Sequence, residues 1–286
     1  MTPAVLADLV RSAVVRVLGD RGLDTGAVPS EVAVTRPRDR GRGDYATAVA
    51  LRAAGPAGVP PRLLAHWLAD ELLGHPAVAA AEVAGAGYVN VELTAETRAD
   101  AVRRAIEAPA PPAPRLTLPA TVRTTTGDLP FADLVAAAGA DAARFAALSD
   151  VTVDVGVLRG RTEENPFHVV VYVHAMLSAL LRNGEDLGVV PTTVDVHLLD
   201  HPDEVDLVRT VAEFPDAVTG PPARTVRYLR RLADQAWEFT EQHRVLPQGD
   251  AQPRREHDAL LALCAAARRV LATGLGQLGI TAPQRL

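Results

Sequence analysis

Residues 85–93 read GAGYVNVEL, and their alternation of apolar and polar side chains decides how the first third of the chain folds. Val89, Val91 and Leu93 would line one face of a β-strand, and the polar residues between them would line the other. We therefore predict a half-buried strand at this point of the chain.

Other periodic segments precede this strand. Apolar residues recur at helical spacing over residues 5–18, and Val32 and Val34 alternate with polar neighbours as in a second strand. A helix should begin at Pro60-Pro61, because proline is favoured in a first turn, and should end near Gly74. This helix is expected to bury Leu63, Leu64, Trp67, Leu68 and Leu72. Residues 1–93 are therefore predicted to form a small α/β domain.

The second part of the chain is predicted to be helical. After a helix capped by Thr94, the run APAPPAP at residues 108–114 cannot sustain a helix or a sheet and should be an extended linker. We assign residues 94–122 to this helix and Pro-rich linker, and residues 123–286 to an all-α helical bundle. Its helices are expected at residues 129–138, 142–148 (capped by Asp141), 166–183, 204–213, 222–242 and 255–273. The predicted fold class is α+β.

Composition limits the classes of function. The 286 residues are 48% hydrophobic, which suits two domains. The net charge is −6 and aromatic residues make up only 4%, so the basic excess usual in nucleic-acid-binding proteins is absent. Two arginine runs either concentrate positive charge locally or merely solvate the surface: Arg36, Arg38, Arg40 and Arg42, and Arg224, Arg227, Arg230 and Arg231.

Two features indicate the compartment. The single cysteine, Cys264, cannot form an internal disulfide and lies in an Ala/Leu-rich segment typical of a buried position. Residues 1–18 lack the uninterrupted apolar run of a signal sequence, and no uncharged apolar stretch reaches the roughly 18 residues of a membrane span. We expect a cytoplasmic protein without a membrane segment.

Three stretches resemble parts of the arginyl-tRNA synthetase family and occur in that family's order. Residues 43–51 (GDYATAVAL) together with residues 85–93 are similar to its additional N-terminal domain. Residues 164–166 (ENP), leading into residues 172–175 (YVHA), resemble the start of its DALR-type anticodon-binding domain. Residues 278–286 (LGITAPQRL) resemble its end. The resemblance implies a chain with these two domains.

The catalytic part of that family has no counterpart in this sequence. In the family, an ATP-binding Rossmann domain lies between the two blocks and uses a His-x-Gly-His turn and a Lys-Met-Ser-Lys-Ser loop. Neither motif occurs here, the sequence contains no lysine, and residues 94–123 fall short of the roughly 50 residues of an independent domain. We therefore predict a chain that is not an enzyme, with no catalytic residue and no cofactor.

The resemblance also places a first pair of tRNA-binding residues. In the family, an aromatic and an amide at the positions of Tyr88 and Asn90 contact an unpaired base of the tRNA D-loop, by stacking and by edge hydrogen bonds. Tyr88 could instead pack on the sheet, but the intervening apolar residues already supply the buried face. This pattern favours an exposed Tyr88.

A second pair follows in the anticodon-binding domain. Tyr172 and His174 stand where the family has the same residue types, so both are candidate tRNA-binding residues. Other positions have lost an aromatic, a cationic or a methionine side chain: Val169, Met176, Thr240 and Leu286. Because stacking is worth about 1–3 kcal/mol per base, reading of the anticodon sequence is expected to be impaired.

No metal site is predicted. Among the eight histidines, His197 and His201 come closest to one another, with Asp195, Asp200 and Asp203 nearby. A His-x-x-x-His pair binds metal well only on one helix face with a third ligand. We therefore interpret this segment as a polar loop.

The sequence favours a non-catalytic arginyl-tRNA synthetase paralogue that binds tRNA weakly, with tRNA-Arg as the first candidate. Net acidity and the lost anticodon residues leave a second function open, a protein-interaction or regulatory module without tRNA binding. A third is an accessory subunit of a separate catalytic chain, which would need an exposed apolar patch near residues 108–123. The oligomeric state is left open.

Overall fold

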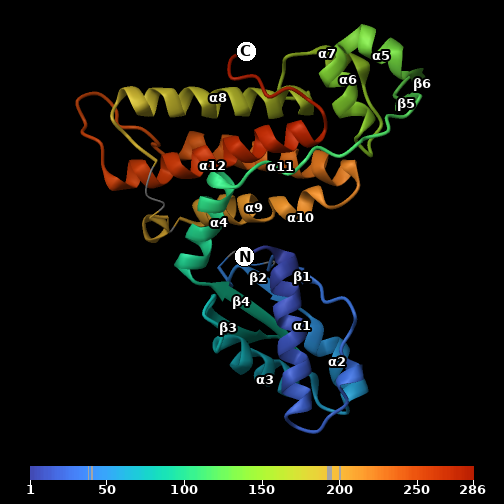
Figure 1. Cartoon of the computed structure of the whole chain (residues 1–286), viewed down its shortest axis with the longest axis vertical. Coiled ribbons are helices and arrows are strands. Elements are labelled where there is room, and N and C mark those ends of the chain that lie inside the picture. Colours follow the sequence, from blue (N-terminus) through green and yellow to red (C-terminus); the bar gives the residue numbers. More distant parts are fainter. Residues whose placement is uncertain (38, 40, 192–194, 200) are drawn as a thin grey trace. The chain divides into compact units, whose positions relative to one another are not determined.

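The computed structural model describes residues 1–37, 39, 41–191, 195–199 and 201–286, and the chain divides into two compact units (Figure 1). Unit 1 is Met1–Asp100 and unit 2 is Ala101–Leu286. The main sheet lies in unit 1 and the long helices lie in unit 2. The predicted α+β class is confirmed.

Unit 1 packs three helices on one face of an antiparallel sheet. The strands pair in the order β1-β2-β4-β3. Its core joins the inward strand residues to the apolar faces of the three helices, so the opposite face of the sheet is left open. The elements are α1 (Pro3–Gly19), η1 (Thr25–Ala27), β1 (Val34–Thr35), β2 (Tyr45–Thr47), α2 (Val49–Ala57), α3 (Pro61–Leu73), β3 (Val78–Ala84) and β4 (Tyr88–Leu93), followed by α4 (Ala95–Glu107).

The predicted helices and strands of this unit are present, but the sequence did not predict β2, α2 or β3, and two further points need correction. The first strand is only two residues long, so Val32 lies outside β1 and packs against the edge of the core. Leu63 was expected to be buried, but it is 41% exposed because it lies on the outer side of α3. Trp67 is half-buried, and the Arg21 guanidinium lies 4.4 Å from its ring centroid.

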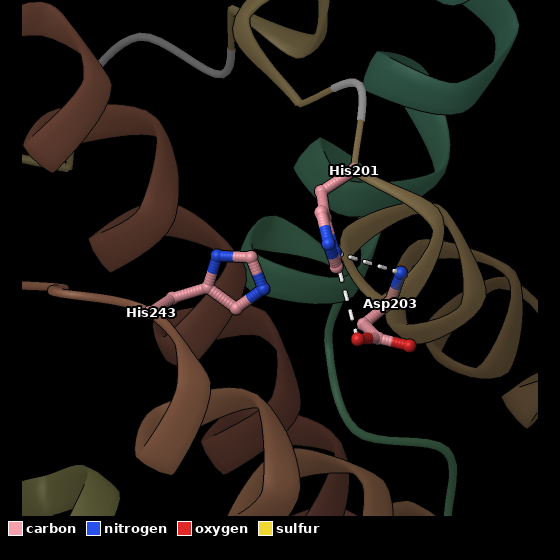
Figure 2. Close-up of side chains that lie close together, drawn as sticks. All are labelled: His201, Asp203 and His243. Carbon is pink, nitrogen blue, oxygen red and sulfur yellow. Dashed lines mark hydrogen bonds and ion pairs between the residues drawn. The ribbon is translucent and has the colours of Figure 1, made fainter.

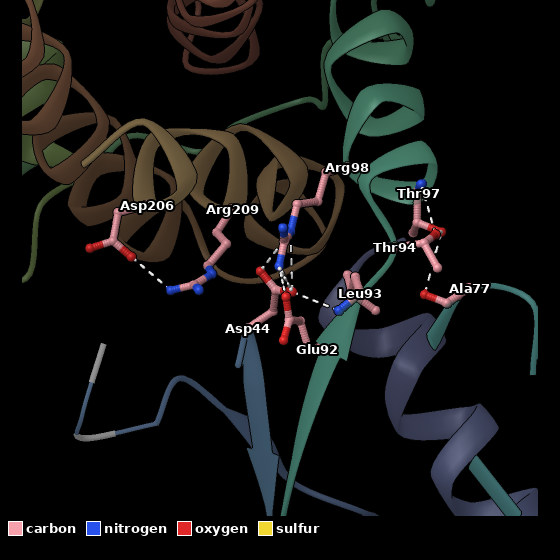
Figure 3. Close-up of polar contacts among 9 residues, drawn as sticks. All are labelled: Asp44, Ala77, Glu92, Leu93, Thr94, Thr97, Arg98, Asp206 and Arg209. Carbon is pink, nitrogen blue, oxygen red and sulfur yellow. Dashed lines mark hydrogen bonds and ion pairs between the residues drawn. The ribbon is translucent and has the colours of Figure 1, made fainter. Parts of the chain in front are cut away.

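A buried carboxylate fixes the corner where the chain enters β2 (Figure 3). The side chain of Asp44 is completely buried, and its Oδ2 accepts a hydrogen bond from the Leu93 amide at 2.7 Å. Arg98 on α4 donates to the same oxygen at 2.8 Å. Gly43 precedes it with a φ of 86°, and a Cβ there would lie 2.9 Å from the Val91 carbonyl oxygen. The glycine and the aspartate are therefore required by the fold at this corner.

Unit 2 opens with a small layer that the sequence only partly predicted. A hairpin of β5 (Thr121–Thr124) and β6 (Gly127–Pro130) packs with α5 (Phe131–Ala138), α6 (Ala140–Ala147) and α7 (Val155–Arg159). The helix predicted at residues 129–138 begins two residues later, at Phe131, because Leu129 and Pro130 belong to β6. Asp141 does not cap α6; its carboxylate instead accepts a hydrogen bond from the Thr281 amide at 3.2 Å.

The rest of unit 2 is a bundle of long helices (Figure 1). Helix α12 satisfies the length and composition of a membrane span, but two thirds of its apolar window is buried in the bundle, which accounts for its character. The run of residues 108–114 is exposed and has no regular structure, as expected, and its Pro111 carbonyl accepts a hydrogen bond from Gln277 at 2.7 Å. The elements are α8 (Pro166–Asp186), η2 (Val196–Leu198), α9 (Pro202–Ala212), α10 (Phe214–Val218), α11 (Pro222–Gln242) and α12 (Arg255–Gln277).

Candidate functional site

Tyr88 stands on the open face of the sheet in unit 1. It is 49% exposed at the start of β4, while the next residue, Val89, is fully buried on the helix-covered face. Its cross-strand partner is Ala84 of β3, whose methyl group is too small to cover the ring. The predicted exposure of Tyr88 is confirmed, and its ring is accessible to a stacking partner.

Asn90 does not share this exposure. It lies at the middle of β4 between Ala46 of β2 and Glu82 of β3, and only 7% of its surface is exposed. Tyr88 and Glu92 flank it along the same face of the strand. The strand alternation places Asn90 on the same face as Tyr88, but the side chain is largely buried, so Asn90 is less accessible to a base than Tyr88 is.

Two exposed carboxylates lie on the open face with Tyr88. Glu82 and Glu92 are both exposed there, and the Arg98 guanidinium lies 3.4 Å from the Glu92 carboxylate. Carboxylates repel phosphate oxygens, so this face is suited to contact with a base rather than with a nucleic-acid backbone.

Three rings from two helices form a second surface in unit 2. Tyr172 on α8 is 39% exposed, and its ring centroid lies 5.1 Å from that of Trp237 on α11. His168 lies one turn earlier on α8, with its centroid 6.0 Å from Tyr172. These separations fall within the range of interacting aromatic pairs. Residues four apart share a helix face, and α8 packs on α11, so the three rings form one row.

This aromatic row lines a groove of about 540 Å³. The loop before α8 contributes Arg161, Thr162, Glu163 and Glu164 to the same groove. The indole of Trp237 donates to a Glu241 carboxylate oxygen at 2.8 Å, which holds it beside Tyr172. The groove therefore offers pre-positioned ring faces next to side chains of both charges.

Electrostatics favour an uncharged ring at His168. Burial, and then the positive charge of Arg161, lower the pKa of His168 below its ordinary value of 6.5. At neutral pH the imidazole therefore adds an aromatic face to the groove. Arg161 supplies positive charge, while Glu163 and Glu164 oppose it.

His174 lies in the core and not on this surface. It is 1% exposed, and its Nδ1 lies 2.8 Å from the Pro283 carbonyl oxygen, within hydrogen-bonding distance. The position is two residues from Tyr172 and so points to the other side of α8. The prediction that His174 contacts tRNA is corrected accordingly: the residue ties the C-terminal segment to the bundle.

The positions predicted to have lost their RNA contacts are not equivalent. Val169 is only 8% exposed, so its side chain packs in the core and the position is not a stacking surface for a base. Met176 and Thr240 are half-buried neighbours, with the Thr240 hydroxyl 3.8 Å from the Met176 sulfur. Leu286 is 64% exposed. The aromatic row is therefore continued by a pair that has no ring.

Three arginines of the two runs pair with carboxylates. Arg42 pairs with Asp39 at 3.1 Å, while Arg38 and Arg40 lie outside the described residues. On α11, Arg227 pairs with Asp150 at 3.4 Å. Arg231 is likewise paired with Glu213. On α11, Arg227, Arg230 and Arg231 still line one hollow together with Asp234, so some positive charge is concentrated there.

One group within the described residues has the arrangement of metal ligands: His201, Asp203 and His243 (Figure 2). One ligand atom from each lies within 4.8 Å of the others. Of the residues considered in the sequence, His197 does not join this group and Asp200 lies outside the described residues. Sequence spacing could not reveal His243, which follows a different helix.

Sequence reasoning also missed two rings of the groove, His168 and Trp237. Their signal was present but incomplete. The four-residue spacing of His168 and Tyr172 on a predicted helix would place both rings on one face. The contribution of Trp237 depends on how α8 packs on α11, which the sequence does not specify.

Family models match both ends of the chain. Residues 4–93 match the model of the arginyl tRNA synthetase N terminal domain, and residues 170–286 match that of the DALR anticodon binding domain. The chain is therefore an arginyl-tRNA synthetase-like protein that contains these two domains. No catalytic domain is evident within its 286 residues.

Solved structures share the fold at low sequence identity. Arginyl-tRNA synthetase from Thermus thermophilus matches with a TM-score of 0.67 and 12% identity, over 98% of this chain and 100% of that one. The enzyme from Plasmodium falciparum matches with a TM-score of 0.67 and 8% identity, over 100% of both chains. A candidate arginyl-tRNA synthetase from Campylobacter jejuni has a TM-score of 0.45 and 17% identity, over 58% of this chain and 39% of that one.

Proposed function

We propose that this chain is a non-catalytic arginyl-tRNA synthetase paralogue that binds tRNA weakly through its aromatic surfaces. The observation that carries the proposal is the Tyr172–Trp237 ring pair on the wall of an open groove, within a DALR anticodon-binding domain. Tyr88 provides a further exposed ring in the N-terminal domain.

The groove is suited to stacking on an unpaired base. Every base has a π face, so stacking on exposed rings is tolerant of sequence and worth about 1–3 kcal/mol per base. The described lining of the groove carries no asparagine or glutamine for the paired contact that these amides make with adenine, although Arg161 and Thr162 could bond other base edges. This composition supports binding to tRNA without strict reading of the anticodon sequence.

The charge distribution supports weak rather than tight binding. Phosphate contacts by arginine supply most non-specific affinity for nucleic acids. Here the Arg161 side chain shares its groove with Glu163 and Glu164, and the net charge of the chain is −6. We therefore expect a shallow dependence of affinity on salt concentration.

The non-catalytic part of the proposal rests on the segment between the two matched domains. Residues 94–122 form α4 and an exposed linker that leads into β5, with no room for a nucleotide-binding domain. The absence of lysine also removes the ammonium groups that commonly stabilise phosphoryl chemistry. The cytoplasmic location, and tRNA-Arg as the preferred partner, belong to the same proposal.

A titration with tRNA-Arg tests the proposal. Tyr172→Ala should weaken binding by about 1–3 kcal/mol, the cost of one stacking platform. Tyr172→Phe keeps the ring and should bind like the unchanged protein. Filter binding over a salt series measures both, and equal affinities for the alanine and phenylalanine variants would contradict the role of the ring.

The same titration distinguishes tRNA binding from a protein-interaction role. If no tRNA binds saturably, a protein-interaction role takes precedence. For an accessory subunit, an exposed apolar patch was expected near residues 108–123, yet none of the exposed large hydrophobic side chains of the described residues falls there. This observation gives the accessory reading no support.

A further inference from the structure

We propose that His201, Asp203 and His243 form a binding site for a divalent transition-metal ion, Zn²⁺ in the cell, at the junction of α9 and α11. This site is separate from the aromatic groove and requires no tRNA. The proposal departs from the polar loop expected from the sequence, because the third ligand comes from a distant part of the chain.

The first argument is the convergence of ligand atoms (Figure 2). His201 Nδ1 and Asp203 Oδ2 lie 3.5 Å apart, and a bound ion would replace the hydrogen bond that this nitrogen accepts from the Asp203 amide at 3.4 Å. Two ligands bonded to one tetrahedral zinc ion at about 2.0–2.1 Å are about 3.4 Å apart, so this pair is already at the required spacing. The three ligand atoms lie within 4.8 Å of one another, and a side-chain shift of at most about 1.4 Å would bring His243 to the same distance.

The second argument is an orphaned nitrogen on His243. Its Nε2 is buried and has no hydrogen-bond partner within the described part of the chain. Buried polar atoms are normally paired, so each exception requires an explanation. A bound cation would supply the missing partner for this lone pair.

The third argument is the support around the His243 ring. Nδ1 lies 3.2 Å from the Glu204 Oε1 atom, and Phe239 stacks on the ring at 4.7 Å between centroids. Histidines that bind metals usually donate their second ring N–H to a carboxylate, which fixes the tautomer and leaves the other nitrogen for the ion. Glu204 has this position, so Nε2 of His243 is the nitrogen assigned to the metal.

The composition of the site indicates which ion it would take. Two imidazoles and one carboxylate suit zinc and neighbouring transition metals better than magnesium or calcium, which prefer oxygen ligands. Half of the His201 side-chain surface is exposed, so water can occupy the fourth position. The expected species is therefore a four-coordinate ion with three protein ligands and one water.

The binding of Zn²⁺ to untagged, metal-free protein tests the proposal by isothermal titration calorimetry. The unchanged protein should bind one ion saturably, and His201→Ala should weaken binding at least about 10-fold. His197→Ala is the matched control: it removes an exposed histidine four residues earlier that lies outside the ligand group, and should bind like the unchanged protein. Circular dichroism confirms that each variant is folded.

Glu204→Gln gives a second, independent readout. Glutamine keeps an oxygen that can accept the hydrogen bond from the His201 backbone amide at the start of α9. Because glutamine carries no charge, it polarises the His243 imidazole less than glutamate does. Loss of such an outer partner typically weakens metal binding about 10–100-fold. Co²⁺ added in place of Zn²⁺ should give the strong visible absorption of a tetrahedral site, and this absorption should be lost in His201→Ala.

Two results would overturn the proposal. The first is the absence of saturable Zn²⁺ binding to the folded, unchanged protein. The second is equal affinity in His201→Ala and His197→Ala, which would place the ion elsewhere. Neither result depends on tRNA, so the metal site and the proposed function are tested independently of each other.

Discussion

Removal of the buried Asp44 carboxylate should destabilise unit 1 by about 3–5 kcal/mol, the usual cost of deleting one partner of a buried ion pair. The side chain of Asp44 is 0% exposed and that of Arg98 is 16% exposed, so water can replace the lost contacts only in part. In Asp44→Ala, the Leu93 amide loses its acceptor at 2.7 Å, and an unsatisfied buried amide alone costs about 1–3 kcal/mol. Arg98 would keep only its longer contact of 3.4 Å with Glu92 among these bonds.

An exposed ion pair in the same unit provides the control. Arg16 and Glu71 lie 2.8 Å apart, close to the distance in the buried pair, but their side chains are 58% and 32% exposed. Arg16→Ala should therefore cost less than about 1 kcal/mol. The comparison isolates burial as the cause of the larger effect.

Urea unfolding followed by tryptophan fluorescence measures both variants. The chain has two tryptophans, Trp67 in unit 1 and Trp237 in unit 2, so a Trp237→Phe background reports the unfolding of unit 1. Equal losses of unfolding free energy in Asp44→Ala and Arg16→Ala would refute the structural role assigned to the buried carboxylate.

Two further predictions concern the backbone and pH. Gly43→Ala should lower the free energy of unfolding in the same assay by about 1–3 kcal/mol, because the φ of Gly43 is 86° and a Cβ there would lie 2.9 Å from a backbone oxygen. Gly58→Ala is the control and should lower it by less, because Gly58 has a φ of 71° but a Cβ there would have no atom within 4 Å. Burial is the main factor that lowers the pKa of His174 below 6.5 in the folded protein. As the pH falls, the unfolded chain therefore takes up a proton at this residue before the folded chain does. The free energy of unfolding of unit 2 should decrease as the pH falls below about 6.5 towards the lowered folded-state pKa. Unfolding of a Trp67→Phe protein at several pH values measures how the free energy of unfolding depends on pH. His174→Gln should make this dependence shallower, and an unchanged dependence in His174→Gln would contradict the prediction.

Much of the fold could be predicted because it follows from local periodicity. Helices α3 and α8 begin at Pro61 and Pro166, as their sequences indicate, and the capping of α4 by Thr94 is confirmed by its hydrogen bond from the Thr97 amide. The hairpin before α5 was missed because its two short strands carry no extended alternation. Strand pairing of this kind depends on contacts between segments rather than on the pattern within one.

The site was predictable only where a single element decides exposure. Tyr88 was placed correctly because alternation along β4 separates its face from that of Val89. Asn90 and His174 were predicted to contact tRNA, but both side chains are largely buried, the first within the sheet and the second beside the C-terminal segment. Trp237 became a candidate only when the packing of α11 against α8 placed it beside Tyr172.

The emission of Trp237 during a titration with tRNA-Arg reports whether a base stacks in the groove. In a Trp67→Phe protein the remaining indole lies 5.1 Å from Tyr172 on the wall of the groove, so a base that stacks there must change its surroundings. The account predicts a saturable quenching of emission that follows the binding curve from filter binding and is reduced in Tyr172→Ala. Saturable tRNA binding without any change in Trp237 emission would place the contact elsewhere and contradict the account.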